Sequence, residues 1–124
     1  MKSAKVIDIE SIRKLIVRKQ MLSPSMRGCS KEDVVNVVSK IAGVQYDPLP
    51  IVAHAHYLTL WNRVEGFQED WLDSLLYEDH LLVEAELMRQ VLHIVPLHEL
   101  PFYYQATRTA RFQSGRDIFD LTGY

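Results

Sequence analysis

Hydrophobic residues recur at helical spacing near the start of the chain, and charged residues fill the positions between them. Four aliphatic residues carry this pattern: Ile9, Ile12, Leu15 and Ile16. The spacing gathers them on one face of a helix, so we predict an amphipathic helix over residues 8–20. A loop rich in Ser, Pro and Gly follows this helix.

Ser30 is predicted to start a second helix. Asp33 lies three residues further on, and a hydroxyl and a carboxylate at this spacing are typical of a capping box at a helix N-terminus. Five aliphatic side chains then form a broad apolar face: Val34, Val35, Val37, Val38 and Ile41. Gly43 fits the C-terminal cap, because glycine readily adopts the backbone conformation that ends helices.

The pattern changes after this helix. Residues 44–47 are predicted to be a short strand or an extended connector, because Pro48 and Pro50 exclude a helix across this point. Apolar spacing then predicts two further helices, one over residues 51–64 and one over residues 68–77, with a glycine between them.

Two strands and a last helix are predicted for the rest of the chain. Residues 81–87 and 91–95 are predicted to form a β-hairpin, and residues 97–112 a helix with Pro101 in its first turn. Helices followed by a β-hairpin are the order of elements found along the chain of a winged-helix domain. The helix at residues 51–64 would then occupy the recognition position of a helix-turn-helix.

These elements predict the fold class and the domain organisation. The expected fold is mainly α, a winged helix-turn-helix domain with a two-stranded β-hairpin over residues 1–112. Residues 113–124 are expected to be a loosely held C-terminal segment.

Charge is distributed unevenly along the chain. The net charge is −2 and the isoelectric point is about 6.2, which argues against a strong nucleic-acid binder. Residues 1–31 nevertheless carry eight basic and two acidic groups, whereas residues 32–87 carry two basic and eleven acidic groups. We expect the basic pole to face phosphate and the acidic pole to face solvent or a partner domain.

Other features of the composition narrow the class of protein. The chain has no apolar run of about 18 residues and no signal-peptide core near its N-terminus, so we expect a cytoplasmic protein with no membrane partner. Its single cysteine, Cys29, excludes an internal disulfide and a zinc site built from cysteines. We expect neither a metal nor another cofactor.

The motif Gln45-Tyr46-Asp47 is the most informative short stretch. Side chains alternate between the two sides of extended backbone, so Gln45 and Asp47 are predicted to share an exposed side and Tyr46 to be buried. An amide beside a carboxylate suits a functional site better than a core.

Further motifs follow in order along the chain: Ile51-Val52-Ala53, Tyr57-Leu58, Leu60-Trp61, Arg63, Trp71-Leu72-Asp73, Leu87-Met88-Arg89 and Leu92-His93-Ile94-Val95-Pro96. Together with Gln45-Tyr46-Asp47, the set resembles the first domain of the AlkZ-like, or YcaQ-like, winged-helix DNA glycosylases over roughly residues 9–112. The resemblance implies a repair enzyme that hydrolyses the N-glycosidic bond of alkylated purines and crosslinked bases in duplex DNA. It also implies a tandem array, with missing C-terminal domains of the same chain as partners.

The resemblance matches Gln45 and Asp47 to the catalytic residues. Cleaving an N-glycosidic bond develops positive charge on the sugar, and a carboxylate can stabilise that charge while it orients or deprotonates water. Gln45 would hold the water or the sugar by hydrogen bonds. The alternative for Asp47 is that it caps the helix following Pro48.

Four further side chains are candidates for contacts with DNA: His54, Arg63, Arg89 and His93. The arginines would bind phosphate, or be ordinary surface or ion-paired residues. The alternative for His54 and His56 is solvent exposure, and for His93 a half-buried place in its strand. His54 and His56 are two residues apart, so on one helix they cannot share a face as metal ligands.

Two other functions fit the sequence. The chain would be a non-catalytic, regulatory winged-helix module that binds DNA, or a structural piece whose DNA groove forms only with missing C-terminal domains. A glycosylase needs Asp47 free in a cleft, whereas a binding module needs only a basic face. Glycosylase activity is expected of the full-length protein.

Overall fold

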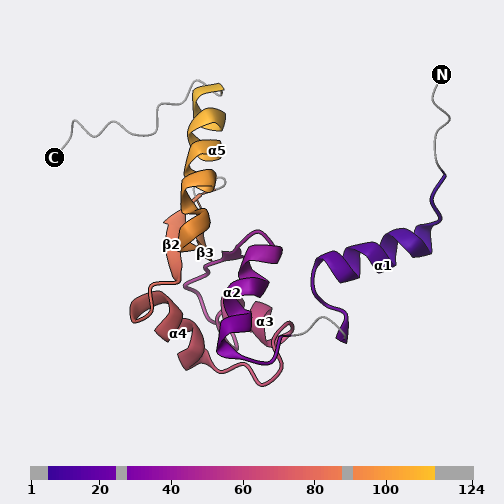
Figure 1. Cartoon of the computed structure of the whole chain (residues 1–124), viewed down its shortest axis with the longest axis horizontal. Helices are drawn as coiled ribbons and strands as arrows, with labels where there is room; N and C mark the ends of the chain where they lie inside the picture. Colours follow the sequence, from indigo (N-terminus) through magenta and orange to yellow (C-terminus); the bar gives the residue numbers. More distant parts are fainter. Residues whose placement is uncertain (1–5, 25–27, 88–90, 114–124) are drawn as a thin grey trace.

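The computed structural model describes residues 6–24, 28–87 and 91–113 of the chain (Figure 1). Its elements are, in chain order, α1 (Ile9–Lys19), α2 (Lys31–Lys40), β1 (Val44–Gln45), α3 (Ala55–Trp61), α4 (Glu69–Tyr77), β2 (Leu82–Glu86), β3 (Leu92–Pro96), a 3-10 turn (Leu97–Glu99) and α5 (Leu100–Gln113). In Figure 1, α2, α3 and α4 lie together beside the sheet. Helix α1 lies apart from this group, and α5 extends away from it.

The sheet is antiparallel, and β3 lies in its centre between β1 and β2. Strands β2 and β3 form the predicted hairpin, with Val83 opposite Val95. Strand β1, predicted as a short strand or an extended connector, forms the third strand of the sheet, with Val44 opposite Ile94. Its pairing with β3 was not predicted. Two residues carry too little pattern to indicate a pairing with a strand far along the chain. The described part is therefore a small domain of five α-helices and a three-stranded sheet.

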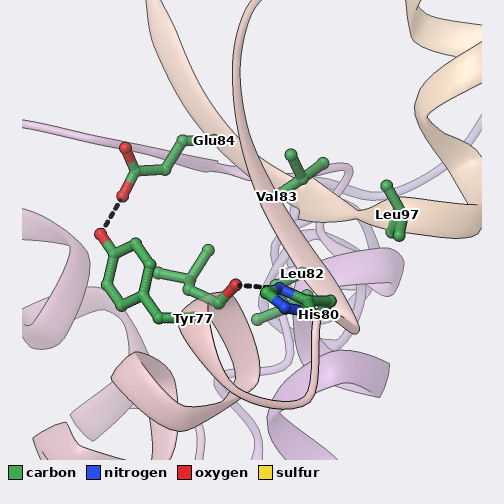
Figure 2. A pocket seen from close by; sticks show the side chains of 7 residues that line it. Tyr77, His80, Leu82, Val83, Glu84 and Leu97 are labelled. Atoms are coloured by element: carbon green, nitrogen blue, oxygen red, sulfur yellow. Dashed lines mark hydrogen bonds between the residues drawn. The ribbon is translucent and has the colours of Figure 1, made fainter.

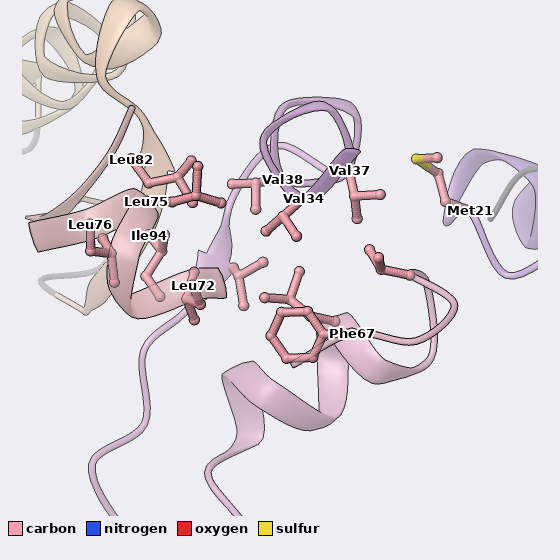
Figure 3. Packing of buried hydrophobic residues seen from close by; sticks show 13 residues of the cluster. Met21, Val34, Val37, Val38, Phe67, Leu72, Leu75, Leu76, Leu82 and Ile94 are labelled. Carbon is pink, nitrogen blue, oxygen red and sulfur yellow. The ribbon is translucent and has the colours of Figure 1, made fainter. Parts of the chain in front are cut away.

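The hydrophobic core lies where the sheet meets α2, α3 and α4 (Figure 3). Its fully buried side chains come from all of these elements: Val34, Val37, Val38, Leu60, Leu72, Leu75, Leu82 and Ile94. Burying one such side chain contributes about 1.5–3 kcal/mol, so these contacts fix how the elements are arranged. Helix α1 contributes no buried residue, although Met21 just after it reaches the core.

The capping box predicted at Ser30 is confirmed. The Asp33 N–H donates to the Ser30 hydroxyl at 3.3 Å, and the Asp33 carboxylate accepts from the Ser30 N–H at 3.1 Å. After α2, the turn passes through left-handed backbone at Ala42 and Gly43, with φ values of 62° and 97°. Glycine suits the second position, because a β-carbon on Gly43 would lie 3.0 Å from Val95. This turn leads the chain directly into β1.

Most helices and strands begin and end within one or two residues of their predicted bounds, and α3 is the main exception. It was predicted over residues 51–64 but begins only at Ala55. Ile51 and Val52, which the predicted helix included, are 98% and 92% exposed, so neither side chain faces the core. The helix N-cap is His54, whose side chain makes no capping bond, so no Ser, Thr, Asp or Asn marked this start.

Candidate functional site

Strand β1 and the connection to α3 place Gln45 and Asp47 in one pocket. Both side chains line it, as their alternation along extended backbone predicts. The pocket has a volume of about 420 Å³. The remaining lining residues come from five segments of the fold: Gln20, Ile41, Gly43, Val44, Ala55, Thr59 and Arg63.

The carboxylate of Asp47 stabilises a turn rather than a helix. Its Oδ1 accepts a hydrogen bond from the Leu49 N–H at 2.9 Å, which closes a turn around Pro48. The alternative that Asp47 caps the following helix was wrong, because α3 begins several residues later. Within the described residues, no group donates to the second oxygen, Oδ2. That oxygen is therefore left for another partner.

Tyr46 faces away from the pocket, as predicted. Its ring packs against the core cluster and stacks on His56, with ring centroids 4.7 Å apart and an interplanar angle of 9°. Its N–H donates to the Leu92 carbonyl at 2.8 Å. The side chain is only half-buried, and so is that of Asp47, so the predicted contrast in exposure is partial.

Arg63 brings a positive charge to the pocket. Its Nε donates to the Gln20 carbonyl at 2.9 Å and its Nη1 donates to the Thr59 carbonyl at 2.8 Å. Burial lowers the pKa of Arg63, although a guanidinium stays charged in proteins. These bonds tie the end of α1 to α3. No motif marked Gln20 or Thr59, because only this packing brings them to the pocket.

The two histidines differ from their prediction. His56 is 3% exposed, so the alternative of solvent exposure was wrong for it. His54 precedes α3 instead of lying on it, and the two rings stack with centroids 5.1 Å apart. Nδ1 of His54 also lies 3.1 Å from the Asp47 carbonyl oxygen. The argument that the two histidines cannot share a face assumed that both lie within one helix, and the N-cap position of His54 lets the rings stack.

His93 shares a side of the sheet with Gln45. The two residues are directly opposite across β1 and β3, and opposite residues of antiparallel strands project to the same face. His93 is half-buried, and its Nδ1 lies 2.8 Å from the Val91 carbonyl oxygen. It does not line the pocket that holds Asp47. Arg89 lies outside the described residues.

A second pocket, of about 440 Å³, lies between α4 and β2 (Figure 2). It is lined mainly by apolar side chains, and the Tyr77 hydroxyl donates to the Glu84 carboxylate at its edge. This hydrogen bond and burial raise the pKa of Tyr77. The side chain of Glu84 is half-buried. None of the predicted site residues lines this pocket.

The exposed face of α4 is acidic. Glu69, Asp70 and Asp73 are exposed there, and Asp73 accepts a hydrogen bond from the Tyr57 hydroxyl at 3.1 Å. Burial, together with the Asp73 carboxylate, raises the pKa of Tyr57 to about 12. This face would repel a polyanion.

The part of the chain that the structure describes contains no group of three or more side chains arranged to hold a metal ion. None of its helices has the length and apolar character needed to span a membrane.

The family model described as "DNA glycosylase AlkZ-like" matches residues 38–120. This match covers most of the chain and includes Gln45, Asp47 and every element from β1 to α5. No solved structure matches the chain.

Proposed function

Because the chain belongs to the AlkZ-like DNA glycosylase family, we propose that it is the DNA-binding domain of a repair glycosylase in which Gln45 and Asp47 excise the damaged base. The observation that carries this proposal is the pocket that Gln45 and Asp47 share with Arg63. The proposed substrate is duplex DNA with an alkylated purine or a crosslinked base.

Asp47 is proposed to act on the charge that forms as the N-glycosidic bond breaks. The sugar becomes positively charged in that transition state, and a nearby carboxylate stabilises it. The same carboxylate would orient or deprotonate the attacking water. The turn bond from the Leu49 N–H holds Oδ1 and leaves Oδ2 to do this.

The other polar groups have proposed roles beside Asp47. The Gln45 amide, which does not titrate, would hold the water or the sugar. Arg63 supplies positive charge toward phosphate, and His54 and His93 are proposed to contact the DNA nearby. A phosphate contact by Arg89 stays a prediction from the sequence.

The architecture that we propose is a winged helix. The order α2, β1, α3, α4, β2 and β3, with β3 in the centre of the sheet, supports this proposal. The helix before the hairpin, which would enter a DNA groove, is then α4, whereas the sequence suggested the helix at residues 51–64. Because the exposed face of α4 is acidic, we propose that the duplex approaches the pocket instead.

The test is the substitution Asp47→Asn in the full-length protein. We expect the rate of release of 7-methylguanine from duplex DNA to fall a few hundred-fold, equivalent to about 3–4 kcal/mol. The asparagine oxygen can still accept from the Leu49 N–H, so DNA affinity and melting temperature should change little. Asp70→Asn, on the exposed face of α4, is the matched control and should keep full activity.

Full excision by a folded Asp47→Asn variant would remove Asp47 from the mechanism. A wild-type protein that binds duplex DNA but releases no base would favour the non-catalytic module.

A further inference from the structure

Asp47 lies in a connection that the core does not hold. Between β1 and α3, the side chains of Leu49, Ile51 and Val52 are 77%, 98% and 92% exposed. The backbone over residues 48–53 forms neither helix nor strand. The position of the Asp47 carboxylate therefore depends on a few contacts at the two ends of this connection.

Two histidines make contacts at those ends. Nδ1 of His54 lies 3.1 Å from the Asp47 carbonyl oxygen, and since a carbonyl only accepts, the His54 N–H donates. The His54 ring stacks on His56, with centroids 5.1 Å apart and an interplanar angle of 19°. His56 in turn stacks on Tyr46, at 4.7 Å and 9°. The stack links Tyr46, in the middle of the motif, to the residue that bonds the Asp47 carbonyl.

His56 anchors this stack to α3. Its side chain is 3% exposed, and its buried Nδ1 has no hydrogen-bond partner among the described residues. An unsatisfied buried atom destabilises a fold, and phenylalanine would fill an apolar position without that penalty. The contacts that His56 makes are therefore those of its flat ring, which stacks on Tyr46 and His54.

We infer that His56 and His54 are positioning residues for the Gln45 and Asp47 side chains. In this role they act through the ring stack and through the Asp47 carbonyl. The inference rests on the proposed function, because it concerns the same pocket. Through these two residues, α3 and its N-cap would hold the exposed connection of residues 48–53 in the conformation that forms the pocket.

Acid should weaken this arrangement. Burial, and next the charge on His54, lower the pKa of His56 below 6.5. The other charged groups that act on His56 raise this pKa, and they come from the connection, α4 and β2: Asp47, Asp73 and Glu84. Since the folded-state pKa is lowered, the neutral His56 ring makes its full contribution to the stability of the folded state above pH 6.5. That contribution is progressively lost as the pH falls below this value.

The kinetic test compares His56→Ala and His56→Phe in the full-length protein. We expect His56→Ala to lower kcat for base release about ten- to a hundredfold with KM within about twofold, because a small misplacement of catalytic groups has effects of that size. His56→Phe keeps a flat ring, so it should restore most of kcat and weaken the fall of kcat in acid. His54→Ala should also lower kcat, whereas His98→Ala, at an exposed site, should not.

A second readout does not need activity. The Leu49 N–H bonds Oδ1 of Asp47, so its NMR resonance and hydrogen exchange report where that carboxylate lies. His56→Ala and His54→Ala should shift the resonance and speed its exchange, and His98→Ala should leave both unchanged.

An unchanged kcat together with an unchanged Leu49 signal in His56→Ala would overturn the inference, and so would a failure of His56→Phe to restore kcat. If the wild type releases no base, the proposed function fails, and the Leu49 signal still decides whether the histidines position Asp47.

Discussion

Helices α1 and α2 have similar amphipathic patterns and different surroundings. Each starts with a side chain that accepts from the helix backbone, Asp8 in α1 and Ser30 in α2. Each carries aliphatic residues at helical spacing. Helix α2 buries three valines in the core, whereas no residue of α1 is buried. In Figure 1, α2 lies among the other elements and α1 lies apart from them.

The difference shows that an amphipathic pattern predicts a helix but not the burial of its apolar face. The aliphatic side chains of α1 keep large exposed fractions, 66% for Ile9 and 56% for Ile16. The contacts that tie this end of the chain down come after the helix, from Met21 in the core and from Arg63 to the Gln20 carbonyl. Helix α1 therefore depends on local interactions, and α2 on the core.

Truncating a side chain on the apolar face of each helix should give the largest difference between them, in the free energy of unfolding. Val37→Ala removes two methyl groups from a fully buried side chain, so we expect a loss of about 2 kcal/mol in the free energy of unfolding. Ile16→Ala should change it by less than about 0.5 kcal/mol, because that side chain is already exposed. Chemical denaturation measures both. Equal losses would show that α1 packs on the domain in solution.

Removing the basic groups of α1 should have the next largest effect, in this case on the affinity for duplex DNA. We expect replacement of Arg13, Lys14, Arg18 and Lys19 by Gln to weaken binding of duplex DNA about tenfold at low salt and to flatten its salt dependence. The control is Lys31→Gln in α2, because Lys31 is paired with Asp79 at 2.6 Å. A titration at two salt concentrations distinguishes the variants. Unchanged affinity after loss of all four charges would exclude α1 from the DNA interface.

The two N-caps should also differ in their effect. Ser30→Ala removes one side of the capping box, and we expect a loss of about 1 kcal/mol in the free energy of unfolding. Asp8→Ala removes the carboxylate that accepts hydrogen bonds from the Ser11 N–H and hydroxyl. These two hydrogen bonds stabilise only α1. It should lower the helical circular dichroism signal and leave the global unfolding midpoint unchanged. A shifted midpoint in Asp8→Ala would show that the two helices unfold together.

Lowering the pH should give the smallest difference in stability between α1 and α2. Hydrogen bonds from the Cys29 N–H and the Ser30 hydroxyl lower the pKa of Asp33 below 3.8. The stability that this carboxylate contributes is thus present above pH 3.8 and is lost as the pH falls through the lower folded-state value. Hydrogen bonds from Ser11 also lower the pKa of Asp8, but its titration should affect only α1.

Thermal unfolding between pH 6 and pH 3 measures this effect in the wild type and in Asp33→Asn. The variant should lose part of the acid dependence. Identical pH profiles would show that Asp33 does not contribute to it.

Much of the candidate site followed from local sequence. The alternation of Gln45, Tyr46 and Asp47 was enough to place the amide and the carboxylate on one side and the ring on the other. The ordered motifs were enough to indicate the family, which the match over residues 38–120 confirms. The histidines were placed wrongly because no capping residue marks where α3 begins.

The sequence by itself determined the helices, the hairpin and the capping box, since these depend on contacts between residues a few positions apart. Only the tertiary structure decided which apolar faces are buried, that β1 pairs with β3, and that Arg63 and Gln20 close the pocket beside Asp47. It also decided that His56 is buried in a stack of rings. The physical reason is that burial and strand pairing depend on partners far along the chain, which periodicity within one segment cannot indicate.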